Sequence, residues 1–93
     1  MAVASGECER GIAFCTTGIG VSIVANKVPG IRCALCTDST LARMTRLHND
    51  ANMLALGGGI VGNLIAMDIV DTFLDTPFSG EEKHRRRIAS IEG

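Results

Sequence analysis

The sequence predicts an α/β domain built on a parallel sheet. Short apolar segments alternate along its 93 residues with amphipathic segments of helical length, so that successive strands are separated by helices. Strands joined in this way form parallel sheets with right-handed crossovers. We therefore expect one domain, residues 1–93, with three strands, flanking helices and a C-terminal helix.

The first strand is expected at residues 11–15. The run "GIAFC" is apolar throughout, which is typical of a strand covered on both faces. As the first strand of the chain it is also expected to have an unpaired edge, which invites pairing with another chain. A helix should follow at 18–27 and stop before Pro29, because the residue that precedes a proline favours extended geometry. The second strand is expected at 31–36.

The next helix and strand are expected within residues 37–57. Asp38 or Ser39 can cap a helix that runs to about residue 50, and a third strand follows at 52–57. The apolar residues of this helix recur at helical spacing: Leu41, Met44 and Leu47.

The longest helix, at about 60–75, is expected to pack one face and to expose the other. The expected packing face holds Ile60, Leu64, Met67 and Leu74. The expected solvent face holds Asp68, Asp71, Thr72 and Asp75. Ser79 and Glu82 match a capping box for the last helix, which should run to about Glu92.

The composition argues against two classes of partner. A net charge of -1 with 46% apolar residues shows no bias toward nucleic acid or membrane. The chain has three Phe and neither Trp nor Tyr, so the aromatic platforms of single-strand nucleic-acid binders are not expected. No segment approaches the length of an apolar membrane span, and the first residues lack the pattern of a signal peptide. We expect a cytoplasmic protein.

The chain has four cysteines: Cys8, Cys15, Cys33 and Cys36. In the cytoplasm they should be reduced thiols. Cys33 and Cys36 form a C-x-x-C, but residues three apart on a strand point to opposite faces, which argues against a metal or redox pair. No second C-x-x-C completes a zinc set. We expect neither a metal nor a cofactor.

The turn "CTTGIG", Cys15 to Gly20, is the first of three segments that can carry chemistry. It follows the first strand, and ligands of open α/β sheets bind at the carboxyl ends of strands. The backbone amides of residues 18–20 suit an anion, and they can lower the pKa of Cys15 so that its thiolate is available. The alternatives are a packing role for Gly18 and Gly20 and an inert, buried Cys15.

The second segment is "RLHNDAN", which holds His48 and Asn49. His48 can act as a general acid or base near neutral pH. The alternative is that both side chains satisfy carbonyls at the end of a helix. The segment leads into a strand rather than out of one, so reaching the first site requires a bent loop or a second subunit.

The third segment is the basic run "KHRRR" at 83–87. Lys83 and Arg87 lie four residues apart, so on a helix they share a face that suits a single phosphate. The adjoining stripe of the helix is expected to dock and holds His84, Ile88 and Ile91.

Three stretches together resemble the ribose-5-phosphate isomerase B family, which includes the galactose-6-phosphate isomerase subunits. They are "GIAFCTTGIGVSIVANKVPGIRCALC", "RLHNDANMLALGGGIVG" and "KHRRRIASI", and the resemblance runs from about Ser5 to Glu92. It implies a Rossmann-like, three-layer fold in a homodimer. It also implies a metal-independent aldose-ketose isomerase of the pentose phosphate pathway, which interconverts ribose 5-phosphate and ribulose 5-phosphate through a cis-enediolate.

The resemblance implies a role for each residue of the first turn. Cys15 matches the base that moves a proton between C1 and C2 of the sugar. Thr17, Gly18 and Gly20 match loop residues that position the sugar and stabilise the enediolate.

The remaining roles fall on the other two segments. His48 matches a residue that assists ring opening, and Asn49 beside it matches a substrate-binding residue. Lys83 and Arg87 match basic residues that hold the phosphate. Sites in this family are built between subunits, which would supply the second chain that His48 requires.

The sequence also departs from the family pattern. Thr16 stands where Gly is usual, Gly59 where many members carry a basic residue, and Lys83 where Arg is usual. Family members begin with another strand-helix-strand-helix segment whose first strand ends in a G-C-D-H-A-G-like motif, and this sequence has no such motif. The chain is expected to be a truncated product, a partial sequence or a subunit completed by another polypeptide, and we favour truncation.

Three hypotheses for function follow. The first is a sugar-phosphate isomerase with Cys15 as base. The second is an inactive sugar-phosphate-binding or dimerisation subunit of the same fold. The third is a polyanion-binding fragment that uses residues 83–87, although the chain is slightly acidic and has no recognisable motif for reading nucleic acid.

Overall fold

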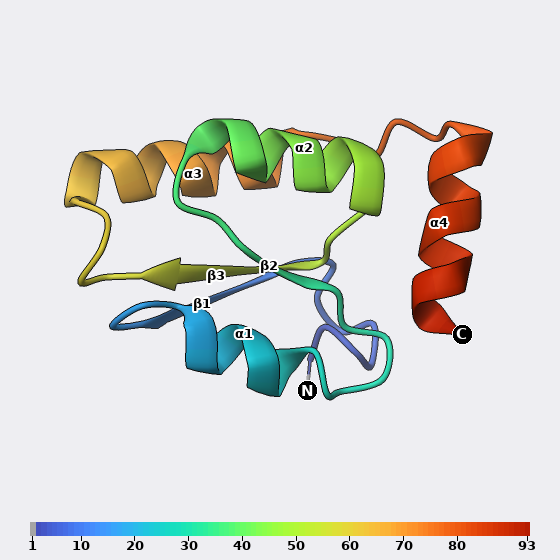
Figure 1. The fold of residues 1–93 in the computed structure, drawn as a ribbon, viewed down its shortest axis with the longest axis horizontal. Coiled ribbons are helices and arrows are strands. Elements are labelled where there is room, and N and C mark those ends of the chain that lie inside the picture. The colour runs from blue at the N-terminus through green and yellow to red at the C-terminus, as the bar shows by residue number, and fades with distance from the viewer. Residues whose placement is uncertain (1) are drawn as a thin grey trace.

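The protein folds into three layers around a parallel sheet, seen in a computed structural model that describes residues 2–93 (Figure 1). The strands are β1 (Gly11–Cys15), β2 (Cys33–Leu35) and β3 (Met53–Gly57), and the helices are α1 (Ile19–Ala25), α2 (Ser39–Asn49), α3 (Asn63–Asp75) and α4 (Glu82–Glu92). Helix α1 covers one face of the sheet, α2 and α3 cover the other, and α4 stands at one end. The predicted α/β class and the alternation of elements are confirmed.

The strand order β1-β3-β2 places the last strand of the chain in the middle. All five residues of β3 are buried, and β3 pairs in parallel with both neighbours. The ladder between β1 and β3 runs from Gly11 opposite Met53 to Cys15 opposite Gly57, so these two strands end together. Within residues 2–93 the outer edge of β1 has no strand partner, as predicted.

Strand β2 is shorter than the 31–36 predicted, because its first residues bond elsewhere. The Ile31 N–H donates to the Val28 carbonyl at 3.1 Å, and the Arg32 N–H donates to the Asn52 side chain at 2.8 Å. At the outer edge of the strand, the Asn26 side chain accepts from the Cys33 N–H and donates to the Cys33 carbonyl. Asn26 therefore takes the place of a neighbouring strand at this position.

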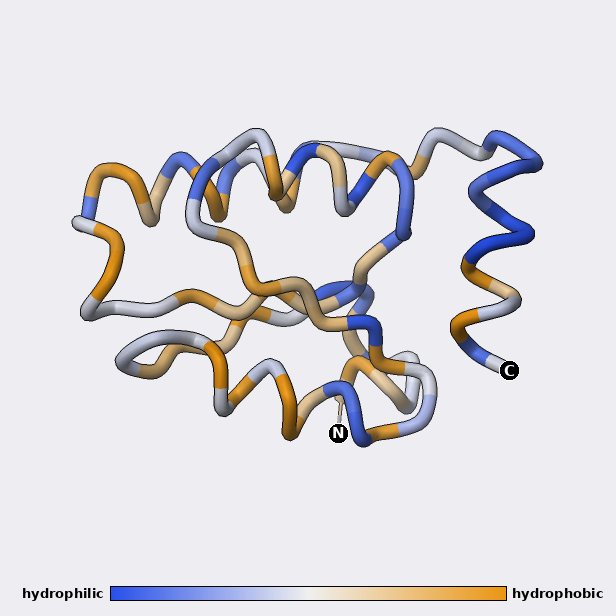
Figure 2. Tube along the Cα trace, in the orientation of Figure 1, coloured by the Kyte–Doolittle hydropathy of each residue, from blue (hydrophilic) through white to orange (hydrophobic). Residues whose placement is uncertain are grey.

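Two apolar clusters pack on the two faces of the sheet. The larger one lies against α2 and α3 and includes Leu54, Leu56 and Phe73, and the smaller one includes Ala25 and Met53. Figure 2 shows the apolar stretches along the strands and the polar first turns of α4.

Cys33 and Cys36 belong to different clusters, so the prediction that their sulfurs diverge is confirmed. Burial raises the pKa of the Cys36 thiol to about 11, and it also raises the pKa of Cys33. Both side chains are therefore held as neutral thiols at physiological pH.

The predicted packing face of α3 is wrong. Its four members, Ile60, Leu64, Met67 and Leu74, are all exposed, and Leu64 retains 81% of its accessible surface. The buried residues are instead Ile69 and Phe73. The helix is apolar on more than one side, so periodicity alone does not select a face, and the three-stranded sheet with α2 covers only the stripe through Ile69 and Phe73. Of the predicted solvent face, the three aspartates are exposed and Thr72 is half-buried.

The bounds of α3 also differ from the prediction. The helix begins at Asn63 rather than near Ile60, because the N–H groups of Ile60 and Val61 both donate to the Gly57 carbonyl in a separate turn. No helix in the described part of the chain is long and apolar enough to span a membrane.

Helix α2 is capped by Asp38, whose carboxylate accepts from the Leu41 N–H at 2.8 Å. Of the apolar residues at helical spacing, Leu41 and Met44 are exposed and Leu47 is half-buried, whereas the buried residues of the helix are Ala42 and Arg46. The small Ala42 allows α2 to approach the core closely, and Arg46 is the other side chain that this helix buries.

Arg46 is buried and its guanidinium joins three elements. It donates to the Thr76 carbonyl after α3 at 2.9 Å, to the Ala51 carbonyl before β3 at 2.7 Å, and to the Asp50 carboxylate at 2.8 Å. Its Cζ also lies 5.9 Å from the centre of the Phe73 ring. A buried charge is tolerated only when it is paired and hydrogen-bonded, and Arg46 meets this requirement.

Helix α4 docks through His84 rather than through a full apolar stripe. His84 is buried and Ile88 is half-buried, but Ile91 is 61% exposed. The predicted capping box is wrong, since α4 has no side-chain cap and the Ser79 hydroxyl instead bonds the Nδ1 atom of His84 at 2.8 Å. A buried imidazole needs a hydrogen-bond partner, and Ser79 supplies it.

We expect His84 to make the stability of the fold depend on pH. Burial is the main cause that lowers the pKa of His84, and the neighbouring His48, Lys83 and Arg87 also lower it, whereas the Glu81 carboxylate raises it. A lowered pKa in the folded state means that the unfolded chain binds more protons. The contribution of His84 is therefore complete above its unfolded pKa of about 6.5, and it is lost as the pH falls through the lower folded value.

The measurement is the thermal unfolding midpoint of the protein between pH 7.5 and pH 5. The midpoint should fall on acidification, and it should fall less in His84→Gln, which keeps a hydrogen-bonding side chain but does not titrate. An equal fall in both proteins would show that other groups dominate.

Candidate active site

Cys15 lies exposed at the carboxyl end of β1, and its sulfur is surrounded by backbone amides. The Gly18 N–H donates to its Sγ atom at 3.0 Å. The N–H of Val21 is the main cause that lowers the pKa of the Cys15 thiol, and those of Gly18, Thr17 and Gly20 add to it against a smaller opposing effect of desolvation. The turn therefore favours the thiolate, which is the reactive form of cysteine.

Gly18 gives this turn its shape. Its φ is +81°, a left-handed conformation that favours glycine. A Cβ at this position would lie 2.4 Å from the Leu35 side chain and 3.0 Å from the Leu56 carbonyl carbon. Gly20 differs, because it lies within α1 and a Cβ there would meet nothing within 4 Å. The fold thus explains the glycine at 18 but not the glycine at 20.

This contrast gives a prediction for two matched substitutions. Gly18→Ala combines a strained φ with overpacking, so it should lower the free energy of unfolding by about 2–4 kcal/mol. Gly20→Ala should leave it unchanged or raise it by up to about 1 kcal/mol, because alanine is the better helix former. Urea denaturation measures both values. Similar losses in the two variants would contradict the packing argument.

Thr17 is exposed, and its hydroxyl is already partly engaged. The Oγ1 atom accepts from the N–H of Ile19, the first residue of α1, at 3.2 Å. The hydroxyl hydrogen is still able to donate toward solvent or a ligand.

The other predicted residues gather around the ends of α2 and α4. His48 is exposed at the last turn of α2, and its ring lies 4.4 Å from the His84 ring, centre to centre, with an interplanar angle of 33°. Lys83 and Arg87 are exposed on α4, where the Lys83 ammonium lies 3.7 Å from the Glu81 carboxylate. Asn49 ends α2, and its carbonyl accepts from Arg32 at 3.1 Å.

One chain does not bring these two groups of residues together. His48 and Asn49 lie just before the start of β3, whereas Cys15 lies opposite the last residue of β3. The four residue steps of the ladder between these levels correspond to about 13 Å of strand. The two groups therefore occupy opposite ends of the sheet (Figure 1), and the sequence-based expectation that His48 is remote from the Cys15 turn in one chain is confirmed.

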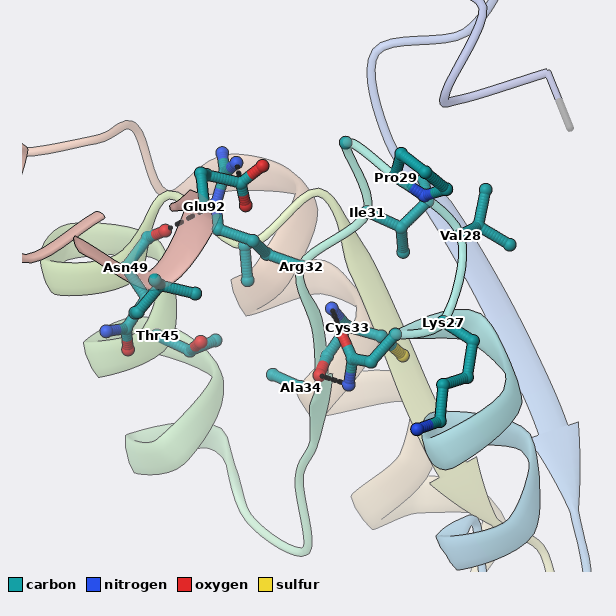
Figure 3. Close-up of a pocket in the computed structure, with 14 residues that line it drawn as sticks. Lys27, Val28, Pro29, Ile31, Arg32, Cys33, Ala34, Thr45, Asn49 and Glu92 are labelled. Carbon is teal, nitrogen blue, oxygen red and sulfur yellow. Dashed lines mark hydrogen bonds and ion pairs between the residues drawn. The ribbon is translucent and has the colours of Figure 1, made fainter. Parts of the chain in front are cut away.

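A groove of about 620 Å³ lies between the end of α1 and α2, beside the outer edge of β2 (Figure 3). Asn49 and Thr45 line one side, and Asn26 and Lys27 line the other. Arg32 crosses it and bonds the Glu92 carboxylate at 3.2 Å. The groove does not include Cys15, so it is separate from the thiol turn.

The sequence profile of the Ribose/Galactose Isomerase family matches residues 1–91. The chain belongs to this family.

Members of the family with solved structures share its fold closely. Ribose-5-phosphate isomerase B from Clostridium thermocellum superposes with a TM-score of 0.95 at 59% sequence identity, over 98% of this chain and 61% of that one. Ribose-5-phosphate isomerase B from Escherichia coli is 44% identical over 98% of this chain and 60% of its own length. Galactose-6-phosphate isomerase subunit LacB from Clostridium acetobutylicum is 40% identical over 97% of this chain and 52% of its own length. The chain thus spans half to three fifths of the length of these relatives.

Two features of the candidate site, one at each end of the sheet, were missed at the level of sequence. One is the stacking of His84 on His48, since His84 was assigned only to a docking stripe. The other is the run Gly57–Gly59, which follows β3 and contacts the Cys15 turn. Three consecutive glycines after a buried strand were a usable signal, because such a run marks a close approach of backbone.

Proposed function

We propose that the protein acts as a sugar-phosphate aldose-ketose isomerase and interconverts ribose 5-phosphate and ribulose 5-phosphate in the cytoplasm, with Cys15 as the base. The observation that carries the proposal is the exposed Cys15 thiol, whose pKa is lowered by the amides of its own turn. Membership of a family of isomerases supports the class of reaction. Relatives that are named for ribose and for galactose phosphates leave the choice of sugar to experiment.

The proposed reaction moves one proton between two carbons. The Cys15 thiolate removes the proton from C2 of the open-chain aldose, and the electron pair of that bond forms a cis-enediolate. The Cys15 thiol then returns the proton to C1, while the hydroxyl proton at O2 passes to O1, so the ketose forms without net oxidation. The turn that holds Thr17, Gly18 and Gly20 positions the sugar and stabilises the negative charge on the enediolate oxygens.

Gly20 supports a ligand at this turn. An alanine would fit the fold and favour the helix, so packing does not account for the missing side chain. The close approach of a substrate to the backbone does account for it.

In our proposal, the second subunit of a homodimer completes the site. It supplies His48, Asn49, Lys83 and Arg87. His48 assists ring opening, Asn49 binds the sugar, and the two basic residues hold the phosphate. The separation of these residues from Cys15 along one sheet supports a site shared between chains.

Mixing two inactive variants tests this arrangement. Cys15→Ser and Arg87→Ala should each be inactive alone. In a mixed dimer, one of the two sites would combine an intact Cys15 with an intact Arg87, so random mixing should restore about a quarter of the parent turnover. Mixed dimers that form but stay inactive would contradict a shared site.

An inactive binding or dimerisation subunit is the second candidate, because one chain places Cys15 and the basic residues of α4 at opposite ends of the sheet. The deciding experiment adds ribose 5-phosphate to the purified chain and measures both ribulose 5-phosphate formation and thermal stability. Turnover supports the isomerase. Thermal stabilisation without turnover, weakened in Arg87→Ala, supports the binding subunit.

A further inference from the structure

The loop that follows β3 is bonded directly to the Cys15 turn. The Gly58 N–H donates to the Cys15 carbonyl at 2.7 Å, and the Gly59 N–H donates to the Thr16 carbonyl at 2.8 Å. These bonds continue the β1–β3 ladder beyond its last pair, Cys15 and Gly57. The backbone on the N-terminal side of the turn is thereby fixed by the neighbouring strand.

Gly57 also touches the middle of the turn. A Cβ built on Gly57 would lie 2.5 Å from both the carbonyl carbon and the carbonyl oxygen of Thr17, and 2.8 Å from the Thr17 Cα. Contacts this short mean that the Thr17 carbonyl rests against the bare Cα of Gly57. The neighbouring atom is backbone, so it cannot yield by a change of side-chain rotamer.

The same peptide group carries the hydrogen bond to the sulfur. The Thr17 carbonyl and the Gly18 N–H belong to one planar peptide unit, and that N–H donates to the Cys15 Sγ at 3.0 Å. Because the unit is rigid, a displacement of the carbonyl side also moves the N–H. The absence of a side chain at Gly57 therefore determines where the Gly18 N–H points, and this N–H is one of the amides, with that of Val21, that act on the sulfur.

We propose that Gly57 is a positioning residue for Cys15: its bare Cα seats the Thr17–Gly18 peptide so that the Gly18 N–H is aimed at the sulfur. Gly59 supports the same turn more weakly, because a Cβ there would lie 3.0 Å from the Thr16 carbonyl oxygen and 3.0 Å from its methyl group. The inference rests on the proposed role of Cys15, but the property that it predicts, the reactivity of the Cys15 thiol, can be measured without turnover.

The chain offers a matched control one residue away. A Cβ on Gly58 would have only the Cys15 carbonyl oxygen within 4 Å, at an ordinary contact distance of 3.8 Å. Neither Gly57 nor Gly58 is among the glycines with positive φ, so an alanine can adopt the φ angle at both positions. Gly57→Ala and Gly58→Ala therefore differ mainly in the contact with Thr17.

The experiment measures the rate of alkylation by iodoacetamide as a function of pH, with each cysteine resolved by peptide mass spectrometry. Cys8, which is exposed and precedes β1, is the internal reference. In Gly57→Ala the pH profile of Cys15 should move to higher pH, and its rate at neutral pH should fall several-fold. The Cys15 profile in Gly58→Ala and the Cys8 profile in both variants should match the parent protein. An unchanged Cys15 profile in folded Gly57→Ala would overturn the inference.

A second variant covers the case in which Gly57→Ala does not fold. Gly59→Ala displaces the Thr16 carbonyl by only a few tenths of an ångström, and it should move the Cys15 profile in the same direction by a smaller amount. A Gly59→Ala protein with the parent profile would then overturn the inference. The readout needs no turnover: a shifted thiol profile together with normal turnover by Cys15→Ser would leave the inference standing and remove the proposed base.

Discussion

Replacing Cys15 by serine is expected to reduce the interconversion of ribose 5-phosphate and ribulose 5-phosphate by about 10²–10⁴-fold, the usual loss on removal of a general base. Serine has nearly the same shape and leaves the amides of the turn in place. Its hydroxyl ionises far less readily than the Cys15 thiol, whose pKa the Val21 and Gly18 amides lower further.

The measurement is the initial rate of ketose formation at saturating ribose 5-phosphate. Cys8→Ser is the control, because Cys8 is also exposed and precedes the sheet, and that variant should retain the parent rate. The thermal unfolding midpoint of Cys15→Ser should stay close to that of the parent, since the side chain is exposed. Ordinary turnover by Cys15→Ser would assign the base to another residue.

Replacing Arg46 by alanine is expected to lower the free energy of unfolding by about 2–4 kcal/mol, because a large buried side chain is truncated and backbone carbonyls lose their donor. The Thr76 and Ala51 carbonyls would lose their charged donor, and the ring of Phe73 would lose a packing neighbour. The three elements that meet at the guanidinium would then keep their apolar contacts and a few backbone hydrogen bonds, such as that from the Ala51 N–H to the Thr45 carbonyl.

Urea denaturation measures this loss, and α2 supplies two comparison variants. Arg43→Ala removes an exposed arginine from the same helix and should change the stability by no more than about 0.5 kcal/mol. Arg46→Lys keeps the charge but loses the planar fork, so its loss should be intermediate. Equal stability of Arg46→Ala and Arg43→Ala would contradict the role given to Arg46.

The elements of the fold were predictable from sequence, because β1 and β3 are continuous apolar runs with a glycine at one end. The helix that follows β1 is stopped ahead of Pro29. The faces that the helices bury were harder to predict. In α3, apolar residues occupy several sides, and the choice of Ile69 and Phe73 over Leu64 and Met67 depends on how narrow the sheet is. Local pattern contains no information on that width.

For the candidate site, the sequence predicts only which end of the sheet each residue occupies. The position of Cys15 after β1 and that of His48 before β3 follow from chain order and a parallel sheet. The contact of Gly57 with Thr17 does not, because it requires β3 to lie beside β1, and the observed order β1-β3-β2 is one of several that the same elements allow. The burial of His84 likewise depends on where α4 docks.

The central position of β3 also constrains how the protein folds during its synthesis. Neither β1 nor β2 has a strand partner until β3 has left the ribosome, since both pair only with β3 in the part of the chain that the structure describes. Pairing β2 with β3 closes a short loop that contains α2. Pairing β1 with β3 closes a longer loop, of about 40 residues. The thiol turn, which rests on Gly57 and the loop after β3, therefore acquires its shape only once β3 is available to pair with β1.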